Sequence, residues 1–343
     1  GVVNDQGIGS GGLESSLNSI LSGTNGRYVY ANGRGNIIPG SEEIRVEAKS
    51  GTSIRLTIDR DVQWVAQNAI SQAVASSRAK SGTVIVMDPK TGEILAQASA
   101  PTFDPNVPSS ITVDKLNNPS VQEVYEPGST GKVITVAAAM EEGLITPETV
   151  FSIPYSMKVS DGVFRDHEKH PTQRLTTTGL LAVSSNTGSI KIGQKLGKDN
   201  LYKYLTKFGI GQSTNSKLPG ESAGILHPVK NWSGTSLPTI SFGQGYSLTA
   251  MQATSVFATI ANNGVRVKPS ILAGVVNESG KYTPAAANEE PIIPIANQPL
   301  FVIVSETTAM QPAKRSRPRI ESGPIFPFSI RVLAEVLSWR VTP

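Results

Sequence analysis

The apolar positions of residues 52–100 predict one amphipathic helix followed by one hairpin. Asp59 is expected as the N-cap of the helix, because its side chain can accept hydrogen bonds from the first free backbone N–H groups. The runs TVIVMD and EILAQAS are β-type and the PKTG between them is typical of a turn, so residues 83–99 predict a hairpin. The apolar stripe of the helix has helical spacing and consists of Val62, Val65, Ala66, Ala69, Ile70, Ala73 and Val74.

Helical patterns dominate beyond residue 130. We expect a helix that ends at Gly143, a second near TTTGLLAVSSN, a third over LYKYLTKFG and a fourth after GQGYSLT. In the fourth, Thr249 and Gln252 have capping-box spacing, and Asn263-Gly264 is a stop signal. The order of these patterns favours an α+β fold, because a strand pair comes first, a run of helices follows, and the β-prone KPSILAGVV comes last. In such a fold the helices gather around an antiparallel sheet, in contrast to a doubly wound one.

Composition narrows the chemistry that the chain can perform. The sequence has 343 residues and no cysteine, which excludes disulfides, thiolate metal sites and cysteine nucleophiles. Only three histidines are present, which argues against a multi-histidine metal centre. The segment Asp166-His167-Glu168-Lys169-His170 lacks H-E-x-x-H spacing, so we interpret it as a polar loop near the mouth of a cleft. We expect neither a metal nor a cofactor.

The net charge of +4 lies entirely in residues 310–343, which hold six Lys/Arg and two Asp/Glu. The preceding 309 residues hold 25 charges of each sign. This distribution contains no basic stripe, so no nucleic-acid partner is expected. No apolar run approaches the ~18 residues that a membrane-spanning helix needs.

The stretch EPGSTGK, residues 126–132, contains a candidate nucleophile. Pro127-Gly128 predicts a turn that places Ser129 in the first turn of the next helix, with Lys132 one turn further on the same face. The helix dipole favours negative charge at Ser129, and burial would lower the pKa of Lys132 until it could accept the serine proton. For this motif alone, the alternative is that Ser129 caps the helix and Lys132 is solvated.

Two further motifs follow in order: S-x-N at Ser184 and Asn186, and G-Q-G at Gly243, Gln244 and Gly245. Together with EPGSTGK they resemble the penicillin-binding proteins, in particular the monofunctional class B transpeptidases of cell division and elongation. The hairpin TVIVMDPKTGEILAQAS, the upstream SIRLTIDRDVQ and the early GLESSLNSIL region are similar to the same family, so the resemblance covers about residues 8–309.

The resemblance implies a division of the chain into three parts. Residues 1–51 would be the remnant of an N-terminal pedestal or dimerisation module. Residues 52–309 would be a truncated transpeptidase (penicillin-binding) domain. Residues 310–343 would be a divergent tail that is not native to the fold. An N-terminal membrane helix, as family members usually have, would precede residue 1 and hold the protein at the extracytoplasmic face of the bacterial cell membrane.

The resemblance also implies a role for each motif residue. Ser129 would attack the penultimate D-Ala carbonyl of a peptidoglycan stem peptide, and Lys132 would be its general base. Ser184 would relay a proton to the leaving amine, Asn186 would bind the substrate amide, and Gly243–Gly245 would line the substrate site. β-Lactams would acylate the same serine. Membrane proteins of the division or elongation complex are the expected partners.

The family's third motif, K-[ST]-G, is not found where it is expected. It should follow the G-Q-G loop, but the three such triplets, at 49–51, 80–82 and 90–92, all precede Ser129. The last is interpreted as a solvated turn. FVIVSETTAM is similar to the helix that leads to the motif, after which the sequence changes character. We hypothesise a reading-frame shift or early stop near residue 310.

Loss of that strand would remove substrate-carboxylate binding and one oxyanion donor, worth ~2.7–4 kcal/mol. We therefore predict weak or absent transpeptidase activity and poor folding for the chain as written. Two alternatives to an active transpeptidase remain open. One is a serine β-lactamase or a β-lactam sensor, and the other is an inactive remnant or scaffold of the cell-wall machinery.

Overall fold

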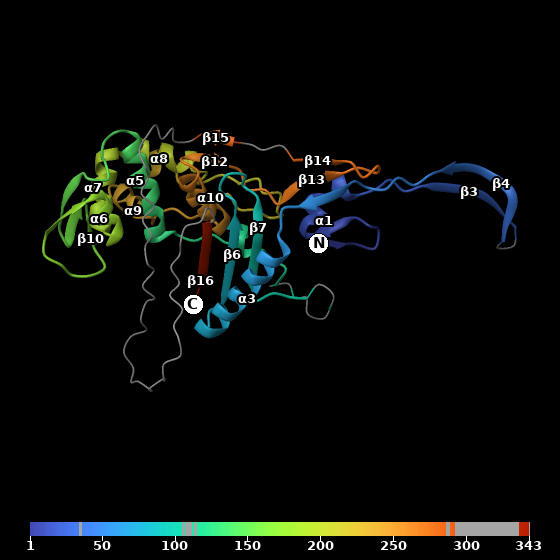
Figure 1. Cartoon of the computed structure of the whole chain (residues 1–343), viewed down its shortest axis with the longest axis horizontal. Coiled ribbons are helices and arrows are strands. Elements are labelled where there is room, and N and C mark those ends of the chain that lie inside the picture. The colour runs from blue at the N-terminus through green and yellow to red at the C-terminus, as the bar shows by residue number, and fades with distance from the viewer. Residues whose placement is uncertain are drawn as a thin grey trace.

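The computed structural model describes residues 1–33, 36–104, 107, 112, 115–285, 289–291 and 336–342. Its elements are arranged along one long axis (Figure 1). A long hairpin projects at one end, a group of helices with α5 to α9 lies at the other, and an antiparallel sheet with its covering helices lies between them (Figure 1).

The central sheet has the strand order β16-β6-β7. Strands β6 (Ser81–Met87) and β7 (Ile94–Ala100) form the predicted antiparallel hairpin. In its turn, the Asp88 carboxylate accepts hydrogen bonds from the backbone N–H of Lys90 at 2.7 Å and of Thr91 at 3.2 Å. The triplet 90–92 therefore lies in a turn, as predicted. On the other side of β6, β16 (Val336–Thr342) pairs antiparallel over its whole length.

Alternate residues of β6 face two different helices, which explains why the strand is apolar on both sides. Val84 and Val86 pack in one cluster with Ile70 of α3 (Arg60–Ser77), whereas Ile85 and Met87 pack in another with Met251 of α10 (Ala250–Ala261). The sheet is thus covered by one helix on each face. This is the α+β arrangement that the order of patterns predicted.

The ends of these two helices follow local sequence signals. Asp59 accepts hydrogen bonds from the N–H groups of Asp61 and Val62, which confirms it as the N-cap of α3. Thr249 and Gln252 form the predicted capping box of α10. The predicted stripe of α3 was wrong at Val65, which is 58% exposed, so the buried stripe is narrower than the spacing indicated.

The helices beyond the sheet form a second core. They are α5 (Lys132–Glu141), α6 (Thr177–Ala182), α7 (Asn186–Leu196), α8 (Lys198–Lys207) and α9 (Ser236–Ser241). Ile134, Ile192, Leu205 and Ile240 belong to one buried cluster that joins α5, α7, α8 and α9. Two small antiparallel pairs lie beside these helices, namely β8 (Val150–Ile153) with β11 (Gln173–Thr176) and β9 (Ser156–Val159) with β10 (Gly162–Arg165).

The remaining elements lie before the sheet and after α10. The N-terminal part contains β1 (Val2–Val3), β2 (Gly9–Gly11), α1 (Gly12–Ser16), α2 (Asn18–Leu21) and the projecting hairpin β3 (Arg27–Gly33) with β4 (Asn36–Val46). Strand β5 (Ser53–Leu56) pairs with β13 (Leu272–Val276), which also pairs with β14 (Tyr282–Pro284). The others are α4 (Pro119–Gln122), a 3₁₀ turn at Val229–Asn231, and β12 (Val265–Val267) paired with β15 (Glu289–Pro291).

The boundaries 1–51, 52–309 and 310–343 remain predictions. Residues 310–335 of the expected tail lie outside the described residues, and residues 336–342 form β16. In the described part of the chain, no helix combines the length and the apolar character that crossing a membrane requires.

Candidate active site

The turn that carries Ser129 is anchored by backbone contacts of the residues that precede it. Tyr125 exchanges two backbone hydrogen bonds with Leu248, and Gly128 adopts a left-handed φ of +57° at the turn. Gly128–Gly131 then form a 3₁₀ turn, and α5 begins at Lys132. Ser129 therefore lies just before α5, not within its first turn. The N-cap of α5 is Gly131, and no side chain among the described residues caps the helix, so the alternative that Ser129 is merely its cap was wrong.

Lys132 joins the two serines into one cluster. Its side chain is buried, with 1% of the residue exposed, so the alternative of a solvated lysine was also wrong. The Lys132 Nζ lies 3.2 Å from Ser129 Oγ and 3.0 Å from Ser184 Oγ, and it also donates to the Ser184 carbonyl oxygen. The Ser184 hydroxyl donates to Ser129 Oγ at 2.9 Å. A proton can thus pass among three adjacent groups.

The electrostatics of the cluster favour a basic amine. Burial lowers the pKa of Lys132 to about 8, while the negative charge of Asp166 acts in the opposite direction. At neutral pH roughly a tenth of such amines are unprotonated, which is a useful fraction for a general base. Ser129 itself is exposed and can be reached by a ligand.

The S-x-N motif is held by the start of α7. Ser184 has a left-handed φ of +54°, and in this conformation its hydroxyl meets Ser129 and Lys132. Ser185 is the N-cap of α7 and accepts a hydrogen bond from the N–H of Gly188 at 2.9 Å. Asn186 is the first residue of α7, and its Nδ2 donates to the Arg165 carbonyl oxygen at 2.9 Å. This bond orients the side-chain amide of Asn186, and the side-chain oxygen Oδ1 takes no part in it.

The G-Q-G loop lies directly behind the nucleophile turn. The N–H of Gly128 donates to the Gly243 carbonyl oxygen at 2.7 Å, and the N–H of Gly245 donates to Glu126 Oε1 at 2.8 Å. Gln244 between the two glycines is exposed. The structure therefore brings this motif against the Ser129 turn. Sequence reasoning did not single out Glu126, although it directly precedes Pro127.

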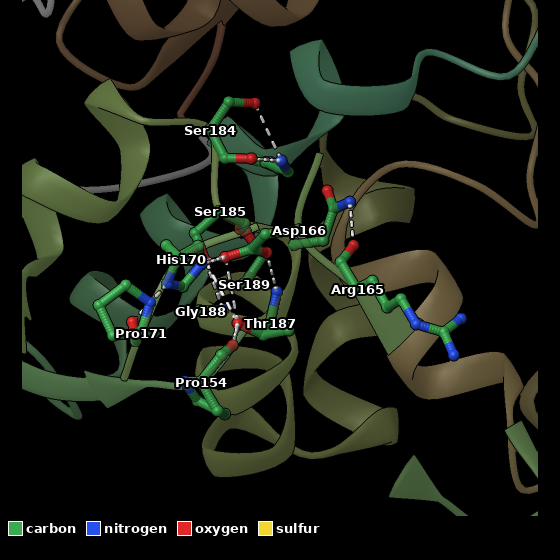
Figure 2. Close-up of polar contacts among 12 residues, drawn as sticks. Pro154, Arg165, Asp166, His170, Pro171, Ser184, Ser185, Thr187, Gly188 and Ser189 are labelled. Atoms are coloured by element: carbon green, nitrogen blue, oxygen red, sulfur yellow. Dashed lines mark hydrogen bonds and ion pairs between the residues drawn. The ribbon is translucent and has the colours of Figure 1, made fainter. Parts of the chain in front are cut away.

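Two further residues next to the site were missed. Asp166 was interpreted as part of a polar loop, but it is only 9% exposed and contacts the start of α7. His170 lies 3.0 Å from the Asp166 carboxylate (Figure 2). The i,i+4 spacing of these two residues was a usable signal for such a pair. The element that the pair contacts depends on tertiary structure and could not be predicted from this spacing. In the part of the chain that the structure describes, no group of three or more His, Cys, Asp or Glu residues could hold a metal.

The chain belongs to the penicillin-binding protein transpeptidase domain family, whose model matches residues 82–298. Among curated relatives, it is 41% identical to the penicillin-binding protein PbpB of Mycolicibacterium smegmatis, over 82% of this chain and 44% of the relative. It is 32% identical to the peptidoglycan D,D-transpeptidase FtsI of Escherichia coli, over 77% of this chain and 44% of the relative. The expected family is thus confirmed, and the chain spans less than half the length of these relatives.

Solved structures give the same result for the fold. The apo crystal structure of penicillin binding protein 3 from Mycobacterium tuberculosis matches with a TM-score of 0.77 at 36% identity, covering 85% of this chain and 63% of that one. A peptidoglycan synthetase from Bifidobacterium adolescentis matches with a TM-score of 0.79 at 33% identity, covering 85% of this chain and 54% of that one. The expected transpeptidase fold is confirmed.

Proposed function

We propose that this chain carries the acyl-transfer site of a peptidoglycan D,D-transpeptidase, with Ser129 as the nucleophile. One observation carries the proposal: a buried lysine Nζ lies 3.2 Å from an exposed serine Oγ, and a second serine hydroxyl contacts both. A serine next to a lysine with a depressed pKa is one of the known activated nucleophiles.

The reaction would proceed in two steps on the same serine. In the first, neutral Lys132 accepts the proton of Ser129 while Ser129 Oγ attacks the penultimate D-Ala carbonyl carbon of a stem peptide. The tetrahedral intermediate collapses, the peptide C–N bond breaks, and terminal D-Ala leaves as an amine after Ser184 passes it a proton. In the second, the amine of a neighbouring stem attacks the ester, which forms the crosslink and frees Ser129.

Substrate binding would involve the two flanking motifs. The Ser129 backbone N–H is proposed as one oxyanion donor, Asn186 as the partner of the substrate amide, and Gly243–Gly245 as the wall behind the nucleophile. No K-[ST]-G triplet follows Ser129 in the sequence. We therefore expect acylation to be slower than in a chain with both oxyanion donors, by roughly 10²–10³-fold.

β-Lactams are the proposed inhibitors. Penicillin binding protein 3 from Mycobacterium tuberculosis, to which this chain is similar, has been solved in complex with ampicillin and with aztreonam. The proposed partners are peptidoglycan stem peptides and membrane proteins of the division or elongation complex. The proposed location is the extracytoplasmic face of the bacterial membrane. We propose no nucleic-acid partner and no cofactor.

The missing third motif favours one second candidate, an inactive remnant or scaffold of the cell-wall machinery. Labelling with a fluorescent penicillin separates the two. Stable label on the wild-type chain and on the exposed-serine control Ser16→Ala, but not on Ser129→Ala, supports the transpeptidase. No label on a folded wild-type chain would support the remnant. Continuous release of hydrolysed drug would instead identify a serine β-lactamase.

A further inference from the structure

The carboxylate of Asp166 binds the first turn of α7 at two residues. One oxygen accepts a hydrogen bond from the backbone N–H of Thr187 at 2.8 Å, and the other accepts from the Ser185 hydroxyl at 2.8 Å (Figure 2). Asn186, which lies between them, is held through its own side chain by the carbonyl oxygen of Arg165. The two consecutive residues 165 and 166 thus hold the three consecutive residues 185, 186 and 187 at the start of α7.

The loop that presents Asp166 is itself fixed. The backbone N–H of Asp166 donates to the Tyr155 carbonyl oxygen at 3.0 Å, and the Thr187 hydroxyl donates to the neighbouring Pro154 carbonyl oxygen at 2.8 Å. Since these contacts join the β8–β9 connection, the loop after β10 and the start of α7, Asp166 is held at a junction of three segments. A small shift of its carboxylate would be passed directly to the turn that orients Ser184.

His170 restrains Asp166 from the solvent side. Its Nε2 lies 3.0 Å from the Asp166 carboxylate, and its Nδ1 lies 2.7 Å from the Pro171 carbonyl oxygen (Figure 2). Both partners are acceptors, so the ring satisfies both only when both nitrogens carry a proton. Consistent with this geometry, the Pro171 carbonyl and then Asp166 raise the pKa of His170. The Tyr155 ring packs edge-on against the imidazole.

The charge of Asp166 also acts on the proposed general base. Asp166 raises the pKa of Lys132 against the larger effect of burial, so it connects the loop after β10 electrostatically to α5. Other charged residues nearby are directed elsewhere. Lys191 and Lys195 of α7 donate to the carbonyl oxygens of Ser152 and Leu144, and Arg165 extends away from Asp166 in Figure 2. The other ionisable residues of the loop are exposed, and they are His167, Glu168 and Lys169.

We propose that Asp166, clamped by His170, is a positioning residue of the acyl-transfer site that fixes the turn carrying Ser184 and Asn186 and keeps one negative charge within electrostatic range of Lys132. This inference deepens the proposed function and rests on it. Removing the charge has two separable effects. The turn exchanges a carboxylate, which accepts from Ser185 and Thr187 with both oxygens, for an amide with a single acceptor oxygen. The pKa of Lys132 falls because its attractive partner is gone.

The test compares Asp166→Asn with Glu168→Gln, which removes one negative charge from an exposed position of the same loop. Acylation by a fluorescent penicillin is measured from about pH 6 to about pH 10, across the titration of the base. For Asp166→Asn we expect the maximal rate to fall roughly 10- to 100-fold, since the turn is misplaced. We also expect the midpoint of the rise to move to lower pH. Glu168→Gln should match the wild type in both respects. A lowered rate with an unmoved midpoint would overturn the proposal.

A second readout does not depend on activity. The pKa of Lys132 is measured directly by lysine ¹³C NMR, and the opening of the turn by hydrogen exchange of the Thr187 amide. Asp166→Asn should lower the pKa of Lys132 and speed the hydrogen exchange of the Thr187 amide. No change in either quantity would overturn the inference. A folded wild type that takes no penicillin label, while Asp166→Asn still lowers the pKa of Lys132, would contradict the proposed function and support the inference.

Variants of the clamp keep the test informative if Asp166→Asn does not fold. His170→Gln retains a donor toward Asp166, whereas His170→Ala removes it. We expect His170→Ala to be acylated several-fold more slowly than the wild type, with faster hydrogen exchange of the Thr187 amide. His170→Gln should restore most of the acylation rate and most of the protection of that amide. If His170→Ala behaved like the wild type in rate and exchange, the clamp and the proposal would be rejected.

Discussion

The backbone N–H of Gly128 lies 2.7 Å from the carbonyl oxygen of Gly243, so the nucleophile turn and the G-Q-G loop meet backbone to backbone. Gly243 has a φ of +91°, and a Cβ at this position would lie 1.8 Å from the Gly128 carbonyl oxygen. No side chain fits between the two segments unless one of them moves. The position of Ser129 thus depends on a glycine more than a hundred residues away in the sequence.

We predict that Gly243→Ala reduces penicillin acylation by roughly 10²-fold, because the added methyl group displaces the turn that carries Ser129. The matched control is Gly280→Ala, where φ is +77° but no atom of the described residues lies within 4 Å of the added Cβ. The control imposes the backbone strain without the contact. Labelling rates for the two variants give the comparison, and equal rates would show that the contact does not position Ser129.

Lys132→Met should separate catalysis from stability. Methionine has a similar length but cannot accept a proton, so acylation should fall by roughly 10²–10⁴-fold. The buried ammonium, whose pKa is lowered to about 8, costs about 3 kcal/mol at neutral pH, and methionine removes that cost along with three hydrogen bonds. We therefore expect no net loss of unfolding free energy. The control is Lys158→Met on an exposed position of β9; a large destabilisation by Lys132→Met alone would contradict the prediction.

The same buried lysine predicts how stability changes with pH. Its folded-state pKa of about 8 lies below the ordinary lysine value of 10.5, so the unfolded chain binds more protons between these values. Stability should therefore rise as pH increases through this window. Above about pH 10 the trend reverses, because burial raises the pKa of Tyr204 and Tyr246 and only their unfolded forms ionise there. Urea unfolding of wild type and Lys132→Met between about pH 8 and about pH 10 should show the rise in the former only.

Gln252 is expected to be a stability residue away from the reaction. Its Oε1 completes the capping box of α10, and its Nε2 donates toward the backbone carbonyl oxygens of Gly209, Gln212 and Ala223. Gln252→Met preserves volume but removes the Oε1 acceptor of the capping box and three donated hydrogen bonds of a buried side chain, so the free energy of unfolding should fall by about 2–4 kcal/mol. Gln194→Met, at an exposed position of α7, should change it by less than about 0.5 kcal/mol. Similar values for both variants would argue against this role.

Features set by neighbouring residues could be predicted from the sequence. The hairpin over 83–99, the Asp59 cap and the Thr249 capping box all depend on contacts within a few positions, and the structure confirms each of them. The exposure of Val65 could not be predicted, because it depends on how wide a face α3 presents to the sheet. The 3₁₀ turn at Ser129 begins where the Gly128 N–H contacts the G-Q-G loop, and this partner is remote in sequence.

The same distinction between local signals and remote contacts applies to the candidate site. Motif order predicted that Ser129, Lys132 and Ser184 belong to one site, and the structure brings them within hydrogen-bonding distance. Asp166 and His170 were missed, because a buried aspartate in a polar segment has the sequence pattern of a solvated loop. Only its contacts with Ser185 and Thr187 reveal its environment.

The divergent tail stays a prediction with a direct test at the DNA level. If a frame shift near residue 310 produced it, translation of the coding sequence in another frame should give a K-[ST]-G triplet within a β-prone segment. If no frame contains such a triplet, the hypothesis is rejected.

The left-handed backbone of Ser184 has an evolutionary consequence. This conformation costs a non-glycine residue about 1–2 kcal/mol, so Ser184→Gly would relieve strain while deleting the hydroxyl that contacts Ser129 and Lys132. Selection for abundance alone would accept that substitution, and selection for crosslinking would reject it. Among descendants of this chain, the residue at position 184 would therefore record which of the two pressures had acted.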